Sequence, residues 1–587
     1  MQLVVLAKAA AVVQISRMRS LPKTGLVAAP LVVLLALGCQ ASIDDGHKGS
    51  GSGGSSAGGA QNLGGGVALP PGTQAAALLP ARIRRFADAE YQATVSSLIG
   101  SGADGISVDF VPDSRQGGFT LNEAQRVDPV FARQLSEAAI ALAADLRKHV
   151  TERAPCQSPT VAAEADKCAD GFIRSFGQKA YRRALRDDEV TQLMTVFHAA
   201  YEGGSYDEGI ELVVRAMLQS AAFLYLTEIG DAPASTIKLT QDELASSVSY
   251  LVQGGPPSDA LLKAAHEGKL DTPEARAASL ADPELGLFIG AAAQARVVRV
   301  IREWLGTDKI SQIAKDSNQY PKFTAVKGDL ESETTAFLSS LVSVEHDGGS
   351  LRQLLAADWT VPTPALAEIY EATGAADPTT GRVSVPSRLG ILHQGAFLSV
   401  FAHAQDTAPV LRGVAVMRRV ACDLVADPVD LKMAVVPPAP DSSKSTRDRF
   451  AAHATPGCAY CHDRIDNYGF AFEDFDAMGQ IRLDDGGHAL DTNVVVAGTD
   501  FAGSYPDSNA LVKAMSTSPQ VRECFARHVF RALAATSAPE LAPSEDDFVK
   551  YWGTTTAGPD GKVDDVYIIG TLTAFITSPS FNYRRAQ

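Results

Sequence analysis

The sequence predicts a mainly α-helical protein with several helical domains in series. Apolar residues recur at the spacing of one helix face in many segments, as in Phe131, Leu135, Ala138, Leu142 and Leu146. No alternation of strand and helix patterns indicates a parallel sheet, and no glycine-rich phosphate loop occurs. A length of 587 residues is enough for three or four such domains.

The bulk composition is that of a globular protein, with 45% hydrophobic and 20% charged residues. The net charge of −16 argues against nucleic-acid binding, because no basic surface is available to displace counterions from phosphates. The sequence also lacks the Gly-x-Ser-x-Gly and His-Glu-x-x-His motifs of hydrolases. We therefore assign no catalytic residues from the sequence.

Residues 1–38 have the pattern of a lipoprotein signal peptide. Arg17, Arg19 and Lys23 precede an apolar run at residues 26–37, which is too short to span a membrane comfortably. The run leads to Cys39, which we expect to carry the lipid, and Met18 is an alternative start to Met1. A plain signal peptide or an uncleaved anchor is the alternative interpretation.

Residues 39–78 are predicted to be a flexible tether, because residues 49–66 consist mainly of Gly, Ser and Ala. The lipid would attach the chain to a membrane, and the tether would hold the folded part clear of it. We therefore expect an extracytoplasmic protein at the outer membrane or in the periplasm, where disulfides persist.

Helical patterns divide the first part of the chain into three units. An N-terminal domain over residues 79–155 has expected helices at 79–100 and from about Pro129. A second domain over residues 156–230 has two helices on either side of residues 181–183 and another at 207–226. A capping box of Thr240 and Glu243 opens a central domain over residues 231–375, with further helices at 259–266, 291–305 and 328–343.

The second part of the chain begins after a predicted linker at residues 371–387, which is rich in Gly, Pro and Thr. Helices are expected at 389–401 and 412–422, a short helix at 447–453 and a short strand at 494–496. Closing helices at 508–535 and 564–577 make up a C-terminal helical domain over residues 501–587.

Residues 458–462 read Cys-Ala-Tyr-Cys-His, the attachment signature of c-type haem. On a helix these positions share one face, so Cys458 and Cys461 can reach the two vinyl groups of one porphyrin. His462 then points at the iron as its proximal ligand. Two alternatives remain: a structural or redox Cys-x-x-Cys with an incidental histidine, and half of a zinc site.

The seven cysteines divide into three groups. Cys39 takes the lipid, and Cys458 and Cys461 take the haem. Of the four that remain, Cys156 and Cys168 lie on either side of a polar loop and are expected to form a disulfide. Cys422 and Cys524 would then pair across the haem motif. The alternative is that some of the four stay free.

An acidic run follows the haem motif, with only Arg464 and Arg482 opposing it. The run is typical of a solvated acidic face. The functional alternatives are a calcium site or a docking face for a basic partner. Its carboxylates are Asp463, Asp466, Glu473, Asp474, Asp476, Asp484, Asp485 and Asp491.

Several motifs, taken together and in order, resemble the planctomycete-type cytochrome lipoproteins, multi-domain surface proteins with a cytochrome-c-like module. The carrying segments include residues 84–91, 176–183, 388–392 and 408–413. The most specific is the Cys-x-x-Cys-His motif with Ile465-Asp466, Gly469-Phe470 and Phe475-Asp476. Asn467 departs from the family, which usually has proline there. The resemblance implies a small cytochrome-c-like helical module with little β structure, over residues 385–500.

The sixth ligand of a haem iron has two main candidates. His453 lies nine residues before His462, at a position where the family often keeps a histidine, and Met478 lies sixteen residues after it. His488, Met515 and His528 are further candidates, although ordinary packing is the better explanation for any lone Met or His. A methionine ligand would raise the redox potential relative to two histidines, and an open position would favour oxygen or peroxide chemistry.

The leading hypothesis is a membrane-anchored, extracytoplasmic c-type haem lipoprotein that transfers electrons to a redox partner protein not identified by the sequence. One rival is a non-catalytic surface scaffold or binding protein whose Cys-x-x-Cys is structural or zinc-bound. Another is a redox-assisted enzyme that acts on a polymeric substrate. An electron carrier is favoured over a defined catalytic enzyme, because no catalytic motif accompanies the haem signature.

Overall fold

The computed structural model describes residues 69–70, 73–100, 110–288, 290–343, 349–372, 374–423, 438, 441, 443–536, 539–556 and 565–586. The predicted signal peptide, the lipidation residue Cys39 and most of the tether lie outside these residues. The prediction of a mainly α-helical chain is confirmed. Every sheet among the described residues is a two-stranded antiparallel pair.

The first unit, which we call the N-terminal lobe, spans residues 82–228. Its own core includes Phe131, Ile173 and Val213. Strand β1 pairs with β2 so that Arg82 lies opposite Glu228, which brings the two ends of the lobe together. Its elements are β1 (Arg82–Arg85), α2 (Asp88–Ile99), α3 (Pro129–Arg147), α4 (Val150–Arg153), α5 (Ala162–Tyr181), α6 (Asp187–Tyr201), α7 (Tyr206–Leu218), α8 (Ala221–Leu224) and β2 (Tyr225–Glu228).

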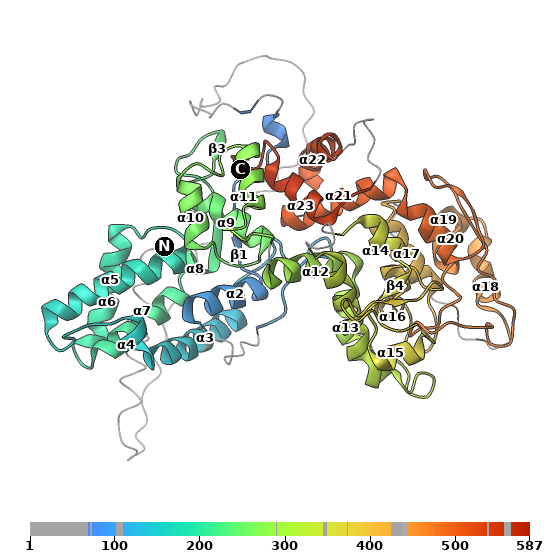
Figure 1. The fold of residues 1–587 in the computed structure, drawn as a ribbon, viewed down its shortest axis with the longest axis horizontal. Coiled ribbons are helices and arrows are strands. Elements are labelled where there is room, and N and C mark those ends of the chain that lie inside the picture. Colours follow the sequence, from blue (N-terminus) through green and yellow to red (C-terminus); the bar gives the residue numbers. More distant parts are fainter. Residues whose placement is uncertain are drawn as a thin grey trace, which may run out of the picture.

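The middle of the chain connects the lobe to the rest. Figure 1 places α12 between the helices of the lobe and those that carry the haem motif. The elements here are β3 (Thr236–Lys238), α9 (Gln241–Val252), α10 (Asp259–His266), α11 (Pro273–Ala281), α12 (Ala291–Leu305), η3 (Thr307–Gln312), α13 (Phe323–Leu341), α14 (Leu351–Ala356), β4 (Trp359–Thr360), α15 (Pro364–Ile369) and β5 (Val383–Ser384).

The haem motif lies in a segment that we call the CxxCH module, residues 388–505. It contains η5 (Ile391–His393), α16 (Gly395–Val400), α17 (Pro409–Arg419), α18 (Thr446–Arg449), η6 (Ala451–Ala454), α19 (Ala459–Phe470), β6 (Val494–Val496) and β7 (Gly503–Tyr505). The chain closes with α20 (Ser508–Ser516), α21 (Pro519–Leu533), η7 (Pro539–Leu541), α22 (Ala542–Thr555), α23 (Ile568–Thr577) and β8 (Tyr583–Arg585).

One continuous core joins the middle of the chain, the CxxCH module and the closing helices. It runs from Leu244 through Trp304 and Tyr468 to Phe581. Strand β8 returns to pair with β3, with Lys238 opposite Tyr583. The module therefore shares one hydrophobic core with the middle of the chain and the closing helices. No helix of the described residues is long and apolar enough to cross a membrane.

The predicted helix over residues 79–100 is wrong in its first part, where the structure has strand β1. Ile83, the apolar residue in this part of the expected helix, is 56% exposed. Arg82 and Arg84 are buried instead, because Glu228 and Glu90 neutralise them. Buried arginines cannot be recognised from an apolar periodicity, since their carboxylate partners come from other elements.

Three further boundaries differ from the sequence prediction. The helix expected over residues 207–226 ends at Leu218, because Ser220 caps a new turn, and strand β2 follows. The predicted linker at 371–387 contains β5, which pairs with β4. The helix expected over 508–535 is divided into α20 and α21, where Ser518 caps a helix that starts with Pro519.

Candidate functional site

Helix α19 carries the haem motif and lies in close contact with α17. A β-carbon added at Gly413 of α17 would clash with the carbonyl oxygen of Ile465, and one added at Gly469 of α19 would clash with that of Pro409. The two glycines therefore let the helix backbones touch, as small residues do wherever helices approach closely. This contact fixes the helix that presents Cys461 and His462.

A buried arginine fixes the chain that follows α19. Arg412 is fully buried and donates to the carbonyl oxygens of Phe472 and Phe475, both at 2.9 Å, and of Asp476 at 2.6 Å. Its charge is balanced by Glu473 at 3.5 Å. Burial raises the pKa of Glu473, and the two neighbouring arginines, Arg412 and Arg482, oppose that shift. The network holds the turn after α19 against α17.

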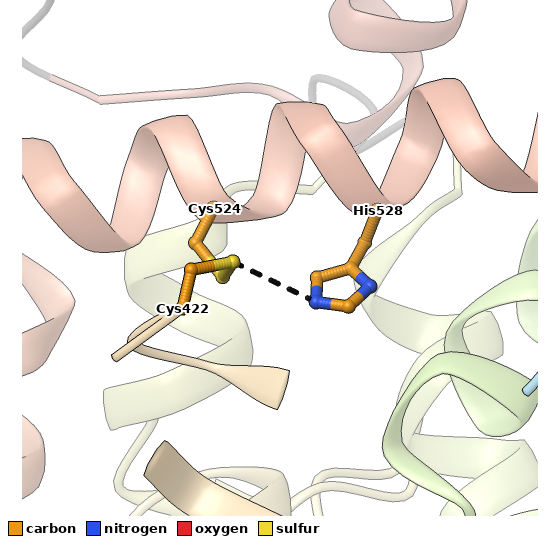
Figure 2. Close-up of side chains that lie close together, drawn as sticks. All are labelled: Cys422, Cys524 and His528. Carbon is orange, nitrogen blue, oxygen red and sulfur yellow. Dashed lines mark hydrogen bonds between the residues drawn. A yellow bond between two sulfur atoms is a disulfide. The ribbon is translucent and has the colours of Figure 1, made fainter. Parts of the chain in front are cut away.

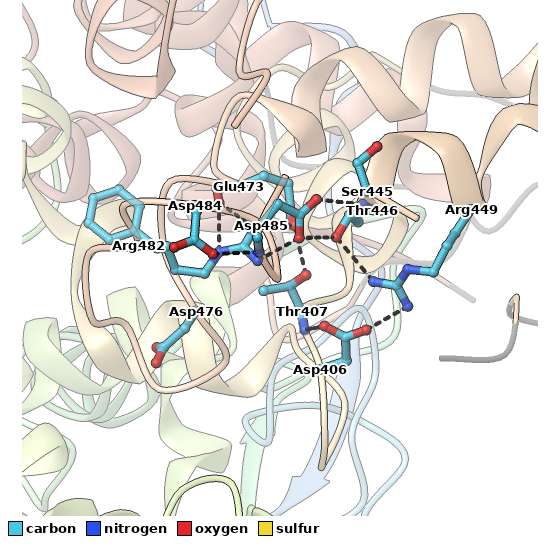
Figure 3. Close-up of polar contacts among 12 residues, drawn as sticks. Asp406, Thr407, Ser445, Thr446, Arg449, Glu473, Asp476, Arg482, Asp484 and Asp485 are labelled. Carbon is cyan, nitrogen blue, oxygen red and sulfur yellow. Dashed lines mark hydrogen bonds and ion pairs between the residues drawn. The ribbon is translucent and has the colours of Figure 1, made fainter. Parts of the chain in front are cut away.

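Two of the acidic residues after the motif, Glu473 and Asp485, are bound within the protein, as Figure 3 shows. Asp485 accepts from the hydroxyl of Thr446 at 2.9 Å and pairs with Arg482 at 3.0 Å. Glu473 accepts from the hydroxyl of Thr407 at 2.7 Å. These bonds tie α18 and the loop before α17 to the turn after α19. Because arginines, hydroxyls and amides already engage these carboxylates, the structure gives the predicted calcium site no support.

The described cysteines fall into the predicted groups. Cys156 and Cys168 form one disulfide, and Cys422 and Cys524 form the other, across 102 positions that contain the haem motif. Cys458 and Cys461 are free and half-buried. They lie at the start of α19, where the backbone N–H of Cys461 donates to the carbonyl of Cys458 at 3.2 Å. The thiols of Cys458 and Cys461 are therefore free to react or to bind a cofactor.

The imidazole of His462 is held by the carboxylate of Asp466 one turn further along α19. Its Nδ1 lies 2.8 Å from Oδ1 of Asp466. The Nδ1 of His453, which precedes the motif in η6, lies 2.7 Å from Oδ2 of the same carboxylate. Because a carboxylate can only accept, each Nδ1 carries a proton, and in the neutral ring each Nε2 is the electron donor.

In this structure His453 lies beside His462, and its role as the ligand on the far side of a haem iron stays a prediction. The rings of His453 and His462 lie 3.6 Å apart, centroid to centroid. Two imidazoles bound to opposite faces of one metal have their nitrogens alone about 4 Å apart, since each metal–nitrogen bond is about 2 Å long. The two rings would therefore have to separate before they could bind opposite faces of one metal.

The second candidate for the distal position, Met478, is a core residue. Its side chain is 2% exposed and packs in a cluster with Phe323, Leu330 and Leu366. No described residue of α19 belongs to that cluster. Met515 is likewise buried in the main core.

His528 lies against the long-range disulfide, as Figure 2 shows. Its Nε2 is 3.8 Å from Sγ of Cys422. Burial, together with Arg531 and Arg419, lowers the pKa of His528 to about 3, so the ring is neutral. Since the two sulfurs are joined to each other, they are not available as metal ligands, and this cluster is structural.

Asn467 stands where the family usually has proline after Ile465-Asp466, and its side chain makes two hydrogen bonds. Its side-chain amide donates to the carbonyl of Asp463 at 2.6 Å, and its oxygen accepts from the backbone N–H of Val495 at 2.9 Å. Asn467 thereby attaches strand β6 to the helix that carries the motif.

Four family models match the chain in series. Each is described as a protein of unknown function: PSD3 (DUF1587) matches residues 84–147, PSD5 (DUF1595) residues 168–228, PSD4 (DUF1592) residues 239–372 and PSCyt3 (DUF1588) residues 388–485. The chain belongs to the planctomycete-type cytochrome family. Comparison with curated proteins and with solved structures gave no match.

The PSCyt3 match contains His453, Cys458, Cys461, His462 and Asp466, which we call the CxxCH cluster. Sequence reasoning found Cys458, Cys461 and His462 and noted His453, but it treated Asp466 as part of a solvated acidic face. The spacing of four residues between His462 and Asp466 could have indicated their contact, since such pairs are neighbours on a helix. No comparable spacing in the sequence indicated the contact between Asp466 and His453.

Proposed function

We propose that this protein is an extracytoplasmic electron carrier with one covalent haem c in the CxxCH module. Cys458 and Cys461 would form the thioether bonds, and Nε2 of His462 would bind the iron. A haem bound there would supply a one-electron couple. The residues of the chain fit this group, because the two thiols and an imidazole with a free Nε2 stand on one turn of one helix.

The bond between His462 and Asp466 is the observation that carries the proposal. Metal-ligating histidines commonly donate their second ring N–H to a carboxylate, which fixes the tautomer and the ring direction. His462 is in that state, with its Nδ1 at 2.8 Å from Asp466. The free state of Cys458 and Cys461, next to two other pairs that are oxidised, supports the same conclusion.

We also propose that Cys39 carries a lipid and that the tether holds the folded body outside the cytoplasm at the outer membrane or in the periplasm. Two structural disulfides are the pattern of a protein that folds in an oxidising compartment, which supports this location. A redox partner protein would then meet the module from the same compartment. Metabolic labelling with a radioactive fatty acid tests the anchor: Cys39→Ala should abolish the label.

The test of the haem proposal uses the mature chain produced together with haem-maturation machinery. A pyridine haemochrome spectrum should report one covalent haem per chain. Cys458→Ala with Cys461→Ala should remove it while circular dichroism stays unchanged, and Cys156→Ala with Cys168→Ala is the matched control that keeps the haem. A well-folded wild-type chain without covalent haem would overturn the proposal.

One observation favours a second candidate, a divalent metal site in place of haem. His453, His462 and Asp466 offer three ligand atoms within 4.8 Å of one another. Two imidazoles and a carboxylate, with the neighbouring thiols, suit zinc. Elemental analysis of the same preparation distinguishes the two: stoichiometric zinc with no haemochrome would establish this candidate in place of the carrier.

A further inference from the structure

The carboxylate of Asp466 is shared between two imidazoles that come from different segments of the chain. His462 belongs to α19, and His453 to η6, nine positions earlier. Each donates its Nδ1–H to a different oxygen of Asp466, at 2.8 and 2.7 Å. The side chains of Asp466, His453 and His462 are only 13%, 22% and 24% exposed, so water competes little for these bonds.

We propose that Asp466 is a positioning residue that sets the tautomer and the electron-donor strength of His462, and that His453 moderates it. This inference rests on the proposed function of the module. An imidazole that donates to a carboxylate is a stronger ligand than one that donates to a neutral group, and it stabilises the oxidised iron. His453 competes for the same charge and so weakens the effect on His462.

The two partners of His462 should therefore shift the redox potential in opposite directions. Asp466→Asn removes the charged acceptor, so reduced haem is favoured and the potential rises. His453→Phe keeps a flat ring beside His462 but removes one donor from Asp466, so the potential falls. Both variants disturb the packing of the same half-buried cluster. Loss of packing alone would therefore not shift the redox potential in opposite directions.

The expected size is about a tenfold change in the ratio of oxidised to reduced haem at a fixed solution potential for Asp466→Asn, which corresponds to about 59 mV for a one-electron couple. A smaller, opposite change is expected for His453→Phe. Asp463→Asn is the matched control, since it removes a carboxylate from the exposed side of the same helix, and it should shift the ratio much less. Haemochrome content is measured in every variant.

Three results would overturn the inference. Equal shifts in Asp466→Asn and Asp463→Asn would mean that only net charge matters. Shifts of the same sign in Asp466→Asn and His453→Phe would mean general disturbance. No shift in either variant would mean that the carboxylate does not reach the iron ligand.

A second measurement keeps the inference testable if the chain takes up no haem. The haem-free mature chain, labelled with nitrogen-15 histidine, should show His462 with its proton on Nδ1, assigned by comparison with His462→Gln. Asp466→Asn should move that proton toward Nε2. A wild-type His462 already protonated on Nε2 would refute the positioning role. Failure of haem attachment with the expected tautomer would refute the proposed function alone.

Discussion

The N-terminal lobe and the CxxCH module contain the same reactive residue types in opposite states. In the lobe, Cys156 and Cys168 are joined, and His198 pairs with Asp166 at 2.7 Å in a surface contact where both side chains are more than a third exposed. In the module, two nearby cysteines stay apart, and two histidines share Asp466 out of bulk water.

This difference indicates where function lies in a chain whose motifs are spread along its whole length. The motif residues of the lobe satisfy one another: Arg84 and Glu90, for example, form a buried pair with two hydrogen bonds of 2.7 and 2.9 Å. Such pairs fix geometry and leave no atom free for chemistry. The CxxCH cluster is tied down at one ring nitrogen of each histidine and leaves its thiols and Nε2 atoms available.

The largest expected effect concerns the two disulfides. Replacing Cys422 and Cys524 by alanine releases a loop of 102 residues and should destabilise the chain by about 4–5 kcal/mol. Replacing Cys156 and Cys168 releases 12 residues and should cost about 3 kcal/mol, because a shorter loop loses less entropy when it is cross-linked. Calorimetric melting of both double variants measures the difference. A larger loss of stability on replacing Cys156 and Cys168 than on replacing Cys422 and Cys524 would contradict this order.

Many of the helices, the position of the CxxCH motif and both disulfides could be predicted from the sequence. Helices were recognised from apolar periodicity, and the motif spacing placed Cys458, Cys461 and His462 on one helix face. The two disulfides followed from counting cysteines. The meeting of His453 with Asp466 could not be predicted, because it depends on how η6 folds back onto α19. The burial of Met478 could not be predicted for the same reason, because it depends on α13 and α15, which are distant in sequence.

The next effect depends on pH and arises from Asp474. Burial raises the pKa of Asp474 to about 7, and its Oδ1 is buried without a hydrogen-bond partner. The folded state therefore holds a proton that the unfolded chain, with an ordinary pKa near 4, releases. The contribution of Asp474 to stability should therefore fall as the pH rises from about 4 to about 7.

Asp474→Asn removes this loss, since an amide does not ionise. The variant should match the wild type near pH 4 and exceed it by about 2–4 kcal/mol above pH 7. Urea unfolding between pH 4 and pH 8 measures the difference. In the lobe, burial and the neighbouring Asp113 also raise the pKa of Asp88 to about 7, but its side chain is 31% exposed, so water screens the effect and Asp88→Asn should gain less. An advantage of Asp474→Asn that is the same at every pH would exclude ionisation as the cause.

The smallest effects contrast one helical glycine from each region. Gly413→Ala should destabilise the module by about 1–3 kcal/mol, because the new methyl group meets the carbonyl of Ile465 and pushes α17 away from α19. Gly171 of α5 has open space around its α-carbon, so Gly171→Ala should stabilise the lobe by about 0.5–1 kcal/mol through helix propensity alone.

Hydrogen–deuterium exchange locates both effects, with faster exchange expected in α17 and α19 for Gly413→Ala and slower exchange in α5 for Gly171→Ala. Because α19 carries His462, the first variant should also reduce haem attachment, whereas the second should leave it unchanged. A Gly413→Ala chain with unaltered exchange in α19 would mean that the two helices can separate without loss. The close contact would then not be what positions the CxxCH cluster, and the glycine pair would have to be explained by folding of α17 itself.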